Sequence, residues 1–336
     1  MTIQASLRSK FIDLAELLGA DQNIQRDSDF HFKLPEHIDV NVNSSIDRLV
    51  FRSFEARDIF GNVKISEDGI VADPLKFKTC QGAFTADMTV MPKANSKFRI
   101  ETHAEIRDID IQQLFTEFGN FGQDFITNQH LHGKTNADVV FRTDIDNTLK
   151  IEEESIYSLV DIEILNGELI EHRSLIEVAD YIRQNKLLGA VVKTDQLKQK
   201  LRRVEFSKLE NQIEIKNSVV HIPEMQLESS AMNLEVSGQH GFDSRVDYRI
   251  NFRLTEILTN NTHSEFGEIE DDGSGGSFFL RMQGPLDNLE IAYDKQAAKE
   301  QRREKFREEK ETLKELLKEE FNIFGKKKDK EENTNS

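Results

Sequence analysis

The sequence has one cysteine, no tryptophan and five prolines among 336 residues, and it has no apolar run long enough to cross a bilayer. A lone Cys80 excludes an internal disulfide and a metal site built from several cysteines. Its strand-like surroundings predict a small buried side chain. The first residues also lack the basic and apolar regions of a signal peptide. Because a spanning helix needs ~20 apolar residues, we expect any membrane anchor to lie upstream of this chain.

Basic residues are scarce relative to acidic ones. The chain holds 44 Lys and Arg against 61 Asp and Glu, a formal net charge of −17. Residues 295–336 hold 13 basic and 11 acidic side chains, a net of +2, so residues 1–294 carry −19. Nucleic-acid binding depends on basic side chains that neutralise phosphates. We therefore expect no nucleic-acid partner for this acidic body.

Sequence motifs that carry catalysis are missing as well. The chain has no Gly-x-Ser-x-Gly, no phosphate-binding loop and no dinucleotide fingerprint. His130 and His132 share a strand face, but the sequence around them offers no third ligand, which favours a solvent-facing pair over a metal site. Residues 270–276 combine acids with glycines but lack the spacing of a calcium loop. We expect no catalytic residues, no metal site and no cofactor.

What the sequence does contain is a long series of apolar residues spaced two apart. A period of two places these side chains on one face of a pleated strand and the polar residues on the other face. The candidates for an apolar binding face are Leu49, Phe51, Val63, Ile65, Leu75, Phe77, Val139, Phe141, Leu234, Val236, Ile250 and Phe252. A one-sided sheet must cover its apolar face with protein or with an apolar ligand.

These patterns predict a mainly β protein with a few helices, built as an elongated, curved antiparallel sheet with an amphipathic groove. The apolar content of 37% lies below the usual ~45–50%, which suits an elongated sheet with much surface per residue. We expect residues 1–45 to form an N-terminal helix and a lead-in, the end of a missing upstream region. Residues 46–290 form the β-rich body. Residues 291–336 form a charged helix and a disordered tail.

Helical spacing appears at three places in the chain. A stripe that includes Leu7, Phe11 and Leu14 predicts an N-terminal helix over residues 5–18. Inside the body we expect helices near 109–118 and 174–202. A capping box from Ser174 to Glu177 predicts the start of the second of these.

The body also contains an internal repeat. The segments Ile46-x-x-Leu49-x-Phe51, Val63-x-Ile65 and Leu75-x-Phe77 are similar to Leu201-x-x-Val204-x-Phe206, Ile213-x-Ile215 and Met225-x-Leu227, and a strand with Gly82 or Gly238 follows each copy. A repeat of this kind predicts that one meander unit was reused to extend the sheet.

Several segments of residues 40–255 resemble the C-terminal region of AsmA-like proteins, which are related to the TamB group. The similar segments are Phe51-Arg-Ser-Phe54-Glu-Ala-x-x-Ile59-x-Gly61-x-Val63, Gly82-Ala-Phe84, Ile106-x-x-Ile109-x-Ile111-x-x-Leu114-Phe115-x-x-Phe118, Ile164-Leu-Asn166-Gly167-x-Leu169, Phe206-x-x-Leu209 and Leu234-x-Val236-x-Gly238. The resemblance implies a β-rich periplasmic body with a groove, anchored in the inner membrane of Gram-negative bacteria. It also implies a role in outer-membrane biogenesis and phospholipid movement, with no catalytic motif to carry over.

Two functions remain open from the sequence. The first is a non-enzymatic lipid-shielding or lipid-transfer module, with a phospholipid or another acyl-chain lipid as its partner. The second is a ligand-free structural or interaction module of the envelope with a closed β core. The C-terminal helix, with Phe306, Leu313 and Lys326–Lys328, adds a candidate contact with a membrane or an envelope protein. We expect a periplasmic location, with inner-membrane anchoring if an upstream transmembrane segment exists.

Overall fold

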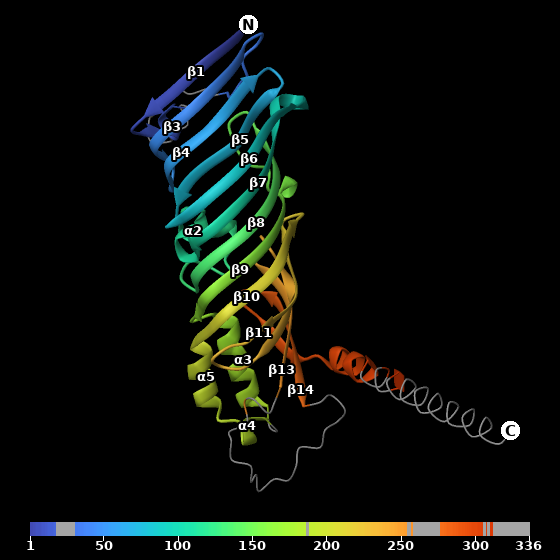
Figure 1. Ribbon diagram of the computed structural model, residues 1–336. Coiled ribbons are helices and arrows are strands. Elements are labelled where there is room, and N and C mark those ends of the chain that lie inside the picture. The colour runs from blue at the N-terminus through green and yellow to red at the C-terminus, as the bar shows by residue number, and fades with distance from the viewer. Residues whose placement is uncertain are drawn as a thin grey trace, which may run out of the picture.

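The computed structural model describes residues 1–17, 31–185, 188–253, 257, 276–304, 307 and 310–311. Its strands form one long, curved and unclosed sheet (Figure 1). The prediction of a mainly β protein with a few helices and an elongated, curved sheet is confirmed.

The strands follow one another across the sheet in chain order, from β1 at one edge to β15 at the other, and β2 pairs with β3. Their bounds are β1 Thr2–Ser9, β2 Ile12–Asp13, β3 Asp39–Phe51, β4 Phe54–Ser66, β5 Gly69–Thr79, β6 Gly82–Lys93, β7 Lys97–Asp110, β8 Leu131–Asp146, β9 Tyr157–Ile170, β10 Arg203–Lys216, β11 Val219–Leu227, β12 Leu234–Gly241, β13 Arg245–Arg253, β14 Ser277–Pro285 and β15 Glu290–Tyr293. Neighbours from β3 onward are antiparallel, whereas β1 and β2 run parallel to β3. The sheet is therefore mixed rather than wholly antiparallel.

The helices lie in the connections between strands. Their bounds are α1 Leu14–Leu17, α2 Ile111–Glu117, α3 Arg173–Gln184, α4 Leu188–Val191 and α5 Thr194–Arg202, with single 3-10 turns at Ala94–Ser96, Gly119–Gly122 and Glu153–Ser155. The helices predicted near 109–118 and 174–202 are confirmed. The capping box is wrong, because α3 begins one residue earlier after His172. The carboxylate of Glu177 instead accepts a hydrogen bond from Arg173 Nε at 2.6 Å.

The N-terminal helix predicted over residues 5–18 is wrong. Residues Thr2–Ser9 form β1, and only the four residues of α1 are helical in the described part of this segment. Ile3, Ala5 and Leu7 alternate at a period of two as well, so the local pattern fits either structure. The parallel ladder with β3 decides between them, because it satisfies backbone groups that β3 would otherwise expose.

The C-terminal boundary predicted at residue 291 also moves. Residues 291–293 belong to β15, and the helix begins after Asp294 and is described over residues 295–304. Asp294 Oδ1 accepts hydrogen bonds from the backbone N–H groups of Gln296 and Ala297 at 3.0 Å, which caps this helix. The acidic insertion at 265–275 and the tail from residue 312 lie outside the described residues.

One large core lies between the helices and the strands of the C-terminal half. Val178 and Ile182 of α3 and Leu201 of α5 are fully buried against side chains from β10 to β14. Ile111 of α2 joins the same cluster. We call the face of the sheet that these helices cover the inner face.

The two copies of the internal repeat adopt similar local geometry. In both, a strand turns into a partner strand whose pairing is interrupted by a bulge that contains proline. Asp73 and Pro74 interrupt β5 between Ala72 and Leu75, and Pro223 interrupts β11 between Ile222 and Met225. In each bulge two residues lie opposite one residue of the neighbouring strand, and this one extra residue keeps the apolar side chains before and after the bulge on one face of the sheet.

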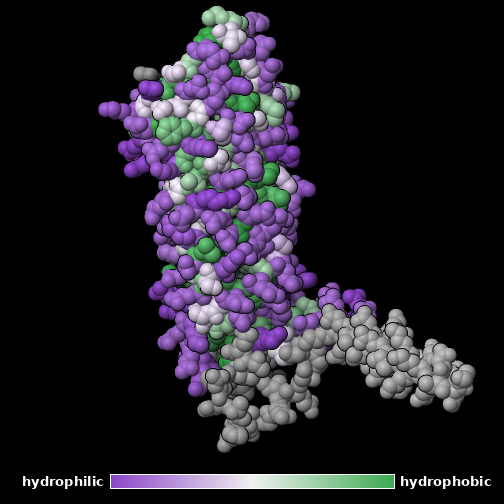
Figure 2. Space-filling model, viewed as in Figure 1, coloured by the Kyte–Doolittle hydropathy of each residue, from purple (hydrophilic) through white to green (hydrophobic). Residues whose placement is uncertain are grey.

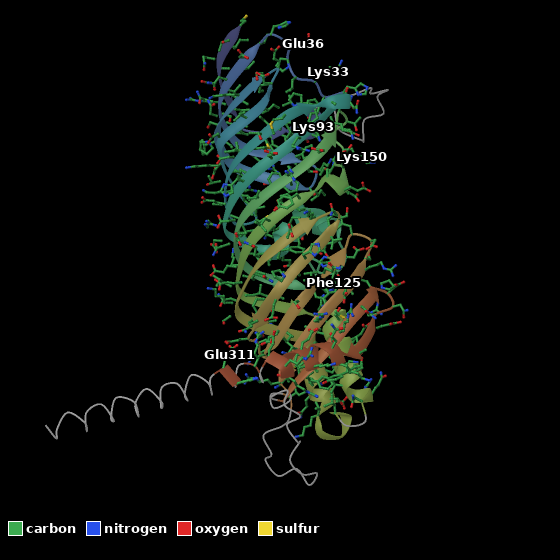
Figure 3. The ribbon with its side chains drawn as sticks, turned by 90° about the vertical axis from the view of Figure 1, so that its right-hand side faces the viewer. Lys33, Glu36, Lys93, Phe125, Lys150 and Glu311 are labelled. Carbon is green, nitrogen blue, oxygen red and sulfur yellow. The ribbon has the colours of Figure 1, made fainter. Side chains whose placement is uncertain are left out.

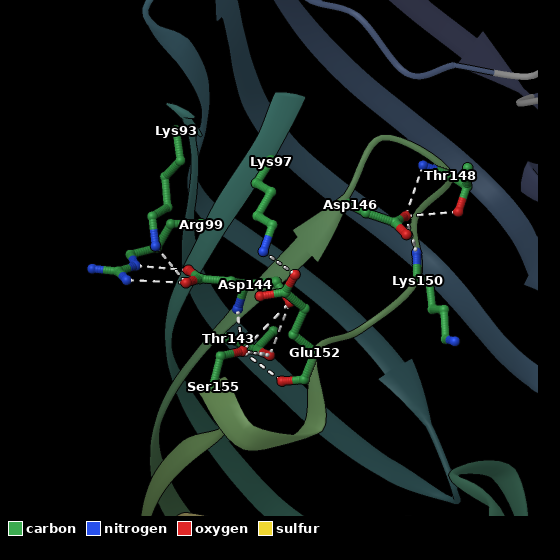
Figure 4. Close-up of polar contacts among 10 residues, drawn as sticks. All are labelled: Lys93, Lys97, Arg99, Thr143, Asp144, Asp146, Thr148, Lys150, Glu152 and Ser155. Atoms are coloured by element: carbon green, nitrogen blue, oxygen red, sulfur yellow. Dashed lines mark hydrogen bonds and ion pairs between the residues drawn. The ribbon is translucent and has the colours of Figure 1, made fainter. Parts of the chain in front are cut away.

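Ion pairs lie across the outer face, and the cluster around Asp144 on β8 is among the least exposed of them (Figure 4). The carboxylate accepts hydrogen bonds from Arg99 Nε and Nη2 at 2.9 and 3.2 Å and from Lys93 Nζ, and 10% of the side chain is exposed. The bonds from Arg99 and then Lys93 lower the pKa of Asp144 to about 2. Its backbone N–H also donates to Ser155 Oγ at 2.8 Å, which fixes the connection between β8 and β9.

Replacing Asp144 with asparagine should lower the free energy of unfolding by about 1–3 kcal/mol, because Arg99 and Lys93 lose a shared anion in a shielded site. Asp138 on the same strand pairs with Arg107, but its side chain is 49% exposed. The matched variant Asp138→Asn should therefore change stability by less than about 0.5 kcal/mol. Urea unfolding of the two variants measures the difference. An equal decrease in the free energy of unfolding for both variants would show that the shielded cluster stabilises the protein no more than an exposed ion pair does.

Candidate functional site: the inner face of the sheet

The inner face of β1 and β3–β8 carries three rows of side chains that run across the strands. Each row follows the residue pairing between neighbouring strands. The first row is Ile3, Val40, Ile65, Ile70, Val90, Ile100 and Thr143; the middle row is Ala5, Val42, Val63, Ala72, Met88, Thr102 and Phe141; the third row is Leu7, Ser44, Gly61, Leu75, Ala86, Ala104 and Val139. None of these residues is charged.

Charged side chains occupy the alternate positions of the same strands, on the outer face. Lys76 and Lys78 alternate with Leu75 and Phe77 on β5, for example. The surface seen in Figure 2 is accordingly hydrophilic for the most part, with hydrophobic groups scattered over it. This segregation makes the N-terminal half of the sheet strongly two-sided.

Two parts of the chain cover opposite sides of the three rows. Phe32 and Leu34 pack on a cluster that contains Val90, beside the first row, and the backbone N–H of Phe32 donates to Asn147 O at 2.7 Å. Figure 3 shows the segment with Lys33 and Glu36 lying alongside the sheet, on the same side as Lys93 and Lys150. The middle row lies between this cover and the one formed by α2.

The second cover is α2 with the turn that follows it. Ser53 Oγ, in the turn between β3 and β4, donates to Glu117 O at 2.7 Å. The ring of Phe118 lies 5.6 Å from that of Phe54, which in turn meets Phe77 edge-on at 6.0 Å. The contacting rings of Phe118, Phe54 and Phe77 cover the inner face beyond the third row.

Most of the middle row is half-buried along the N-terminal half of the sheet, where Ala72 is buried, and most of it is buried along the C-terminal half, where Ile215 is half-buried. Val42, Val63 and Phe141 are half-buried, and none of them belongs to a cluster of buried residues in the described part of the chain. The row continues through Ser158, Ile215, Val220 and His240 to Val246. Val220, His240 and Val246 are at most 8% exposed. The inner face is thus partly open at one end and closed at the other.

The twelve residues predicted for an apolar binding face divide between these two ends. The half-buried ones are Leu49, Phe51, Val63, Ile65, Leu75, Phe77, Val139, Phe141 and Val236. Five of them occupy the three rows described above. Leu234, Ile250 and Phe252 are at most 4% exposed inside the closed core. These three offer a ligand almost no surface.

Other residues of the rows were not predicted. The other members of the middle row are small, isolated or weakly polar in the sequence: Ala5, Val42, Ala72, Met88 and Thr102. A search for pairs of large apolar residues passes over such positions. The signal that could have found them is the continuous lack of charge at every second residue, as from Phe98 to Ile106 on β7.

Phe125 joins the N-terminal half of the molecule to the closed core (Figure 3). Its ring stacks on Tyr248 at 4.9 Å and lies 5.0 Å from the ring of His172 and 5.1 Å from that of His240. His172 Nε2 donates to Phe125 O at 2.9 Å, and His240 Nδ1 lies 2.8 Å from the hydroxyl of Tyr248. The second ring nitrogen of each histidine has no hydrogen-bond partner among the described residues.

Burial controls the ionisation of this cluster. Desolvation lowers the pKa of His172 to about 4, with a further contribution from His130, and desolvation lowers the pKa of His240 to about 4. Desolvation also raises the pKa of the Tyr248 hydroxyl. At neutral pH the cluster is therefore uncharged, like the three rows of the N-terminal half.

The structure also places the histidines and the cysteine singled out from the sequence. His130 and His132 are half-buried rather than solvent-facing, and the ring of His130 lies 5.2 Å from that of His172. No group of three or more His, Cys, Asp and Glu residues in the described part of the chain could hold a metal ion. Cys80 is 4% exposed, and burial raises the pKa of its thiol to about 12. The prediction of a small buried cysteine is confirmed.

Two further observations concern membrane-spanning helices and similarity to known proteins. Among the residues that the structure describes, no helix is both long and apolar enough to span a membrane. The chain has no match among the protein-family models, the curated proteins or the solved structures with which it was compared.

Proposed function

We propose that the chain is a non-enzymatic lipid-shielding module whose inner face covers the acyl chains of a phospholipid or a similar lipid. The observation that carries the proposal is the set of three uncharged rows, unbroken across seven strands, with every residue of the middle row except the buried Ala72 half-buried. A charged side chain on this face would lose its hydration beneath an acyl chain at a large cost in free energy, and the three rows contain none. Burial of apolar surface, at roughly 25 cal/mol per Å², would drive binding with little headgroup selectivity.

The dimensions of the rows suit this ligand. Seven strands spaced ~4.8 Å apart extend about 29 Å, which is close to the ~30 Å hydrocarbon thickness of a bilayer and about twice the length of one acyl layer. Lipids would therefore lie across the strands rather than along them.

The resemblance to AsmA-like proteins supports the same function. On this proposal the chain acts in the periplasm, contributes to outer-membrane biogenesis and is anchored in the inner membrane if an upstream transmembrane segment exists. The C-terminal helix, described over residues 295–304, supplies the contact with a membrane or an envelope protein.

Binding of a fluorescent phospholipid to the purified, delipidated chain tests the proposal. We expect saturable binding of the probe and its displacement by unlabelled phospholipids with different headgroups. Native mass spectra of protein that has not been delipidated should show lipid adducts. Protein that carries no lipid and fails to bind the probe would contradict the proposal.

The second candidate is a ligand-free structural module with a closed core. The observation that favours it is the burial of Leu234, Ile250 and Phe252 beneath α3 and α5. The two candidates differ in the N-terminal half, where the lipid proposal requires the middle row to be open to a guest. Failure of lipid binding in a stably folded chain would favour the structural module.

A further inference from the structure

The N-terminal edge of the sheet is a long, regular and unpaired strand. β1 pairs with β3 on one side, and no described strand pairs with its other side (Figure 1). The ladder between β1 and β3 runs without a register shift from Thr2 to Ser9. An edge of this kind presents a row of free backbone donors and acceptors to another strand.

The outward-facing residues of β1 follow from its bonds to β3. The backbone N–H of Asp39 donates to Met1 O at 2.9 Å, so the odd-numbered residues of β1 turn their backbone groups toward β3. In a parallel strand the alternate residues turn theirs away. Thr2, Gln4, Ser6 and Arg8 therefore direct their N–H and C=O groups outward from the sheet.

Most of β1 lacks the features that normally protect an edge strand, and Arg8 near its end is its one charged residue. Residues Thr2–Leu7 contain no charge and no proline, and Leu7 is 41% exposed. The opposite edge is better protected, because β15 has only four residues and contacts α3. Natural sheets shorten, bulge or charge their edges to prevent pairing, so an edge strand of eight residues whose first six carry no charge indicates a surface that another strand covers.

We propose that β1 pairs in antiparallel register with β1 of a second copy of this chain, about a two-fold axis at Ala5. In this register Gln4 lies opposite Ser6 of the second copy and Thr2 opposite Arg8, so all four outward-facing residues exchange backbone hydrogen bonds. Ala5 meets Ala5 at the axis, where a small side chain is needed. No other register uses all four residues.

Charge and polarity favour a second copy as the partner. Arg8 lies opposite Thr2 of the second copy, and Thr2 pairs with Asp39 on β3. A cation of one chain thus shares a cross-strand row with an anion of the other, twice by symmetry. On the inner face Ile3 meets Leu7, and the two middle rows join through Ala5. The dimer would extend one uncharged inner face across both copies, but the pairing itself does not depend on lipid.

Analytical ultracentrifugation of the full chain, with any tag at the C-terminus and with lipid removed, tests the proposal. We expect a dimer that dissociates on dilution. Gln4→Pro removes an outward N–H without touching the ladder to β3 and should weaken the dimer roughly tenfold or more. Gln4→Ala keeps that N–H and should leave the dimer intact. A chain that stays monomeric at every concentration overturns the proposal. A chain that does not dimerise but binds a strand of another protein overturns it as well.

Cysteine cross-linking tests the register. Ala5→Cys places two thiols opposite each other at a non-hydrogen-bonded pair, where Cβ atoms lie about 5 Å apart. Oxidation should link most of the dimer. Ile3→Cys faces Leu7 instead and should not cross-link, and the native Cys80 is buried. Equal cross-linking of both variants would rule out this register.

Discussion

Lowering the pH from 7 to 5 is expected to destabilise the protein by roughly 2 kcal/mol for each of His172 and His240. The pKa of both histidines falls from 6.5 to about 4 on folding. Between these values the unfolded chain binds protons that the folded chain does not, so stability falls as the pH drops. The contribution is complete above pH 6.5 and lost by about pH 4.

The structural reason is the environment of the second ring nitrogen. Protonation of His172 places a proton on Nδ1, which has no acceptor among the described residues, beside the rings of Phe125 and His130. His240 meets the same cost against Phe125 and the Tyr248 hydroxyl. The charge would lie within the contact that joins the loop of Phe125 to the closed core. We expect this contact to open first.

Urea unfolding at several pH values, read by circular dichroism, measures the effect. The variants His172→Gln and His240→Gln keep a side-chain donor but do not titrate, and the double variant should show a much flatter dependence between pH 4 and 6.5. Asp144 provides an internal reference, because its folded pKa of about 2 makes its own contribution disappear only below pH 3.8. A wild-type stability that is constant from pH 7 to 4.5 would contradict the prediction.

The strands and the interior helices could be predicted because their signals are local. Alternation at a period of two is decided by adjacent residues, as in Leu75 to Phe77, and helical spacing by residues within one turn of each other, as in Ile111 to Phe115. The N-terminal segment fits both patterns, so its structure depends on pairing with β3, whose residues lie 37 positions further along the chain, as Asp39 does from Thr2. Local sequence cannot resolve that choice.

Which part of the apolar face is covered could not be predicted for a related reason. Val63 and Ile250 have the same alternation in the sequence, yet one is half-buried and the other 4% exposed. The difference comes from α3 and α5, which fold back over β10 to β14, and from the insertion of Phe125 between His172 and Tyr248. Such covers depend on packing between segments far apart in the chain.

Replacing Phe141 with glutamate is expected to weaken lipid binding tenfold or more while the protein remains folded. Phe141 lies in the middle row between Thr102 and Ser158, where a carboxylate would meet the acyl chain. Loss of one apolar contact and desolvation of a charge are each worth about 1–3 kcal/mol, which corresponds to a factor of ten or more. The side chain is half-buried, so the carboxylate can still reach water in the lipid-free protein.

The chain supplies controls on either side of this position. Val140, the preceding residue, is 46% exposed on the outer face, so Val140→Glu should leave both lipid binding and stability nearly unchanged. Phe252 is 2% exposed in the closed core, so Phe252→Glu should cost more than about 4 kcal/mol and unfold the protein. Titration with a fluorescent phospholipid and urea unfolding separate the three outcomes. If Phe141→Glu unfolds the chain as Phe252→Glu does, the middle row is core and the lipid proposal fails. If it folds and binds lipid as Val140→Glu does, the ligand does not use this face.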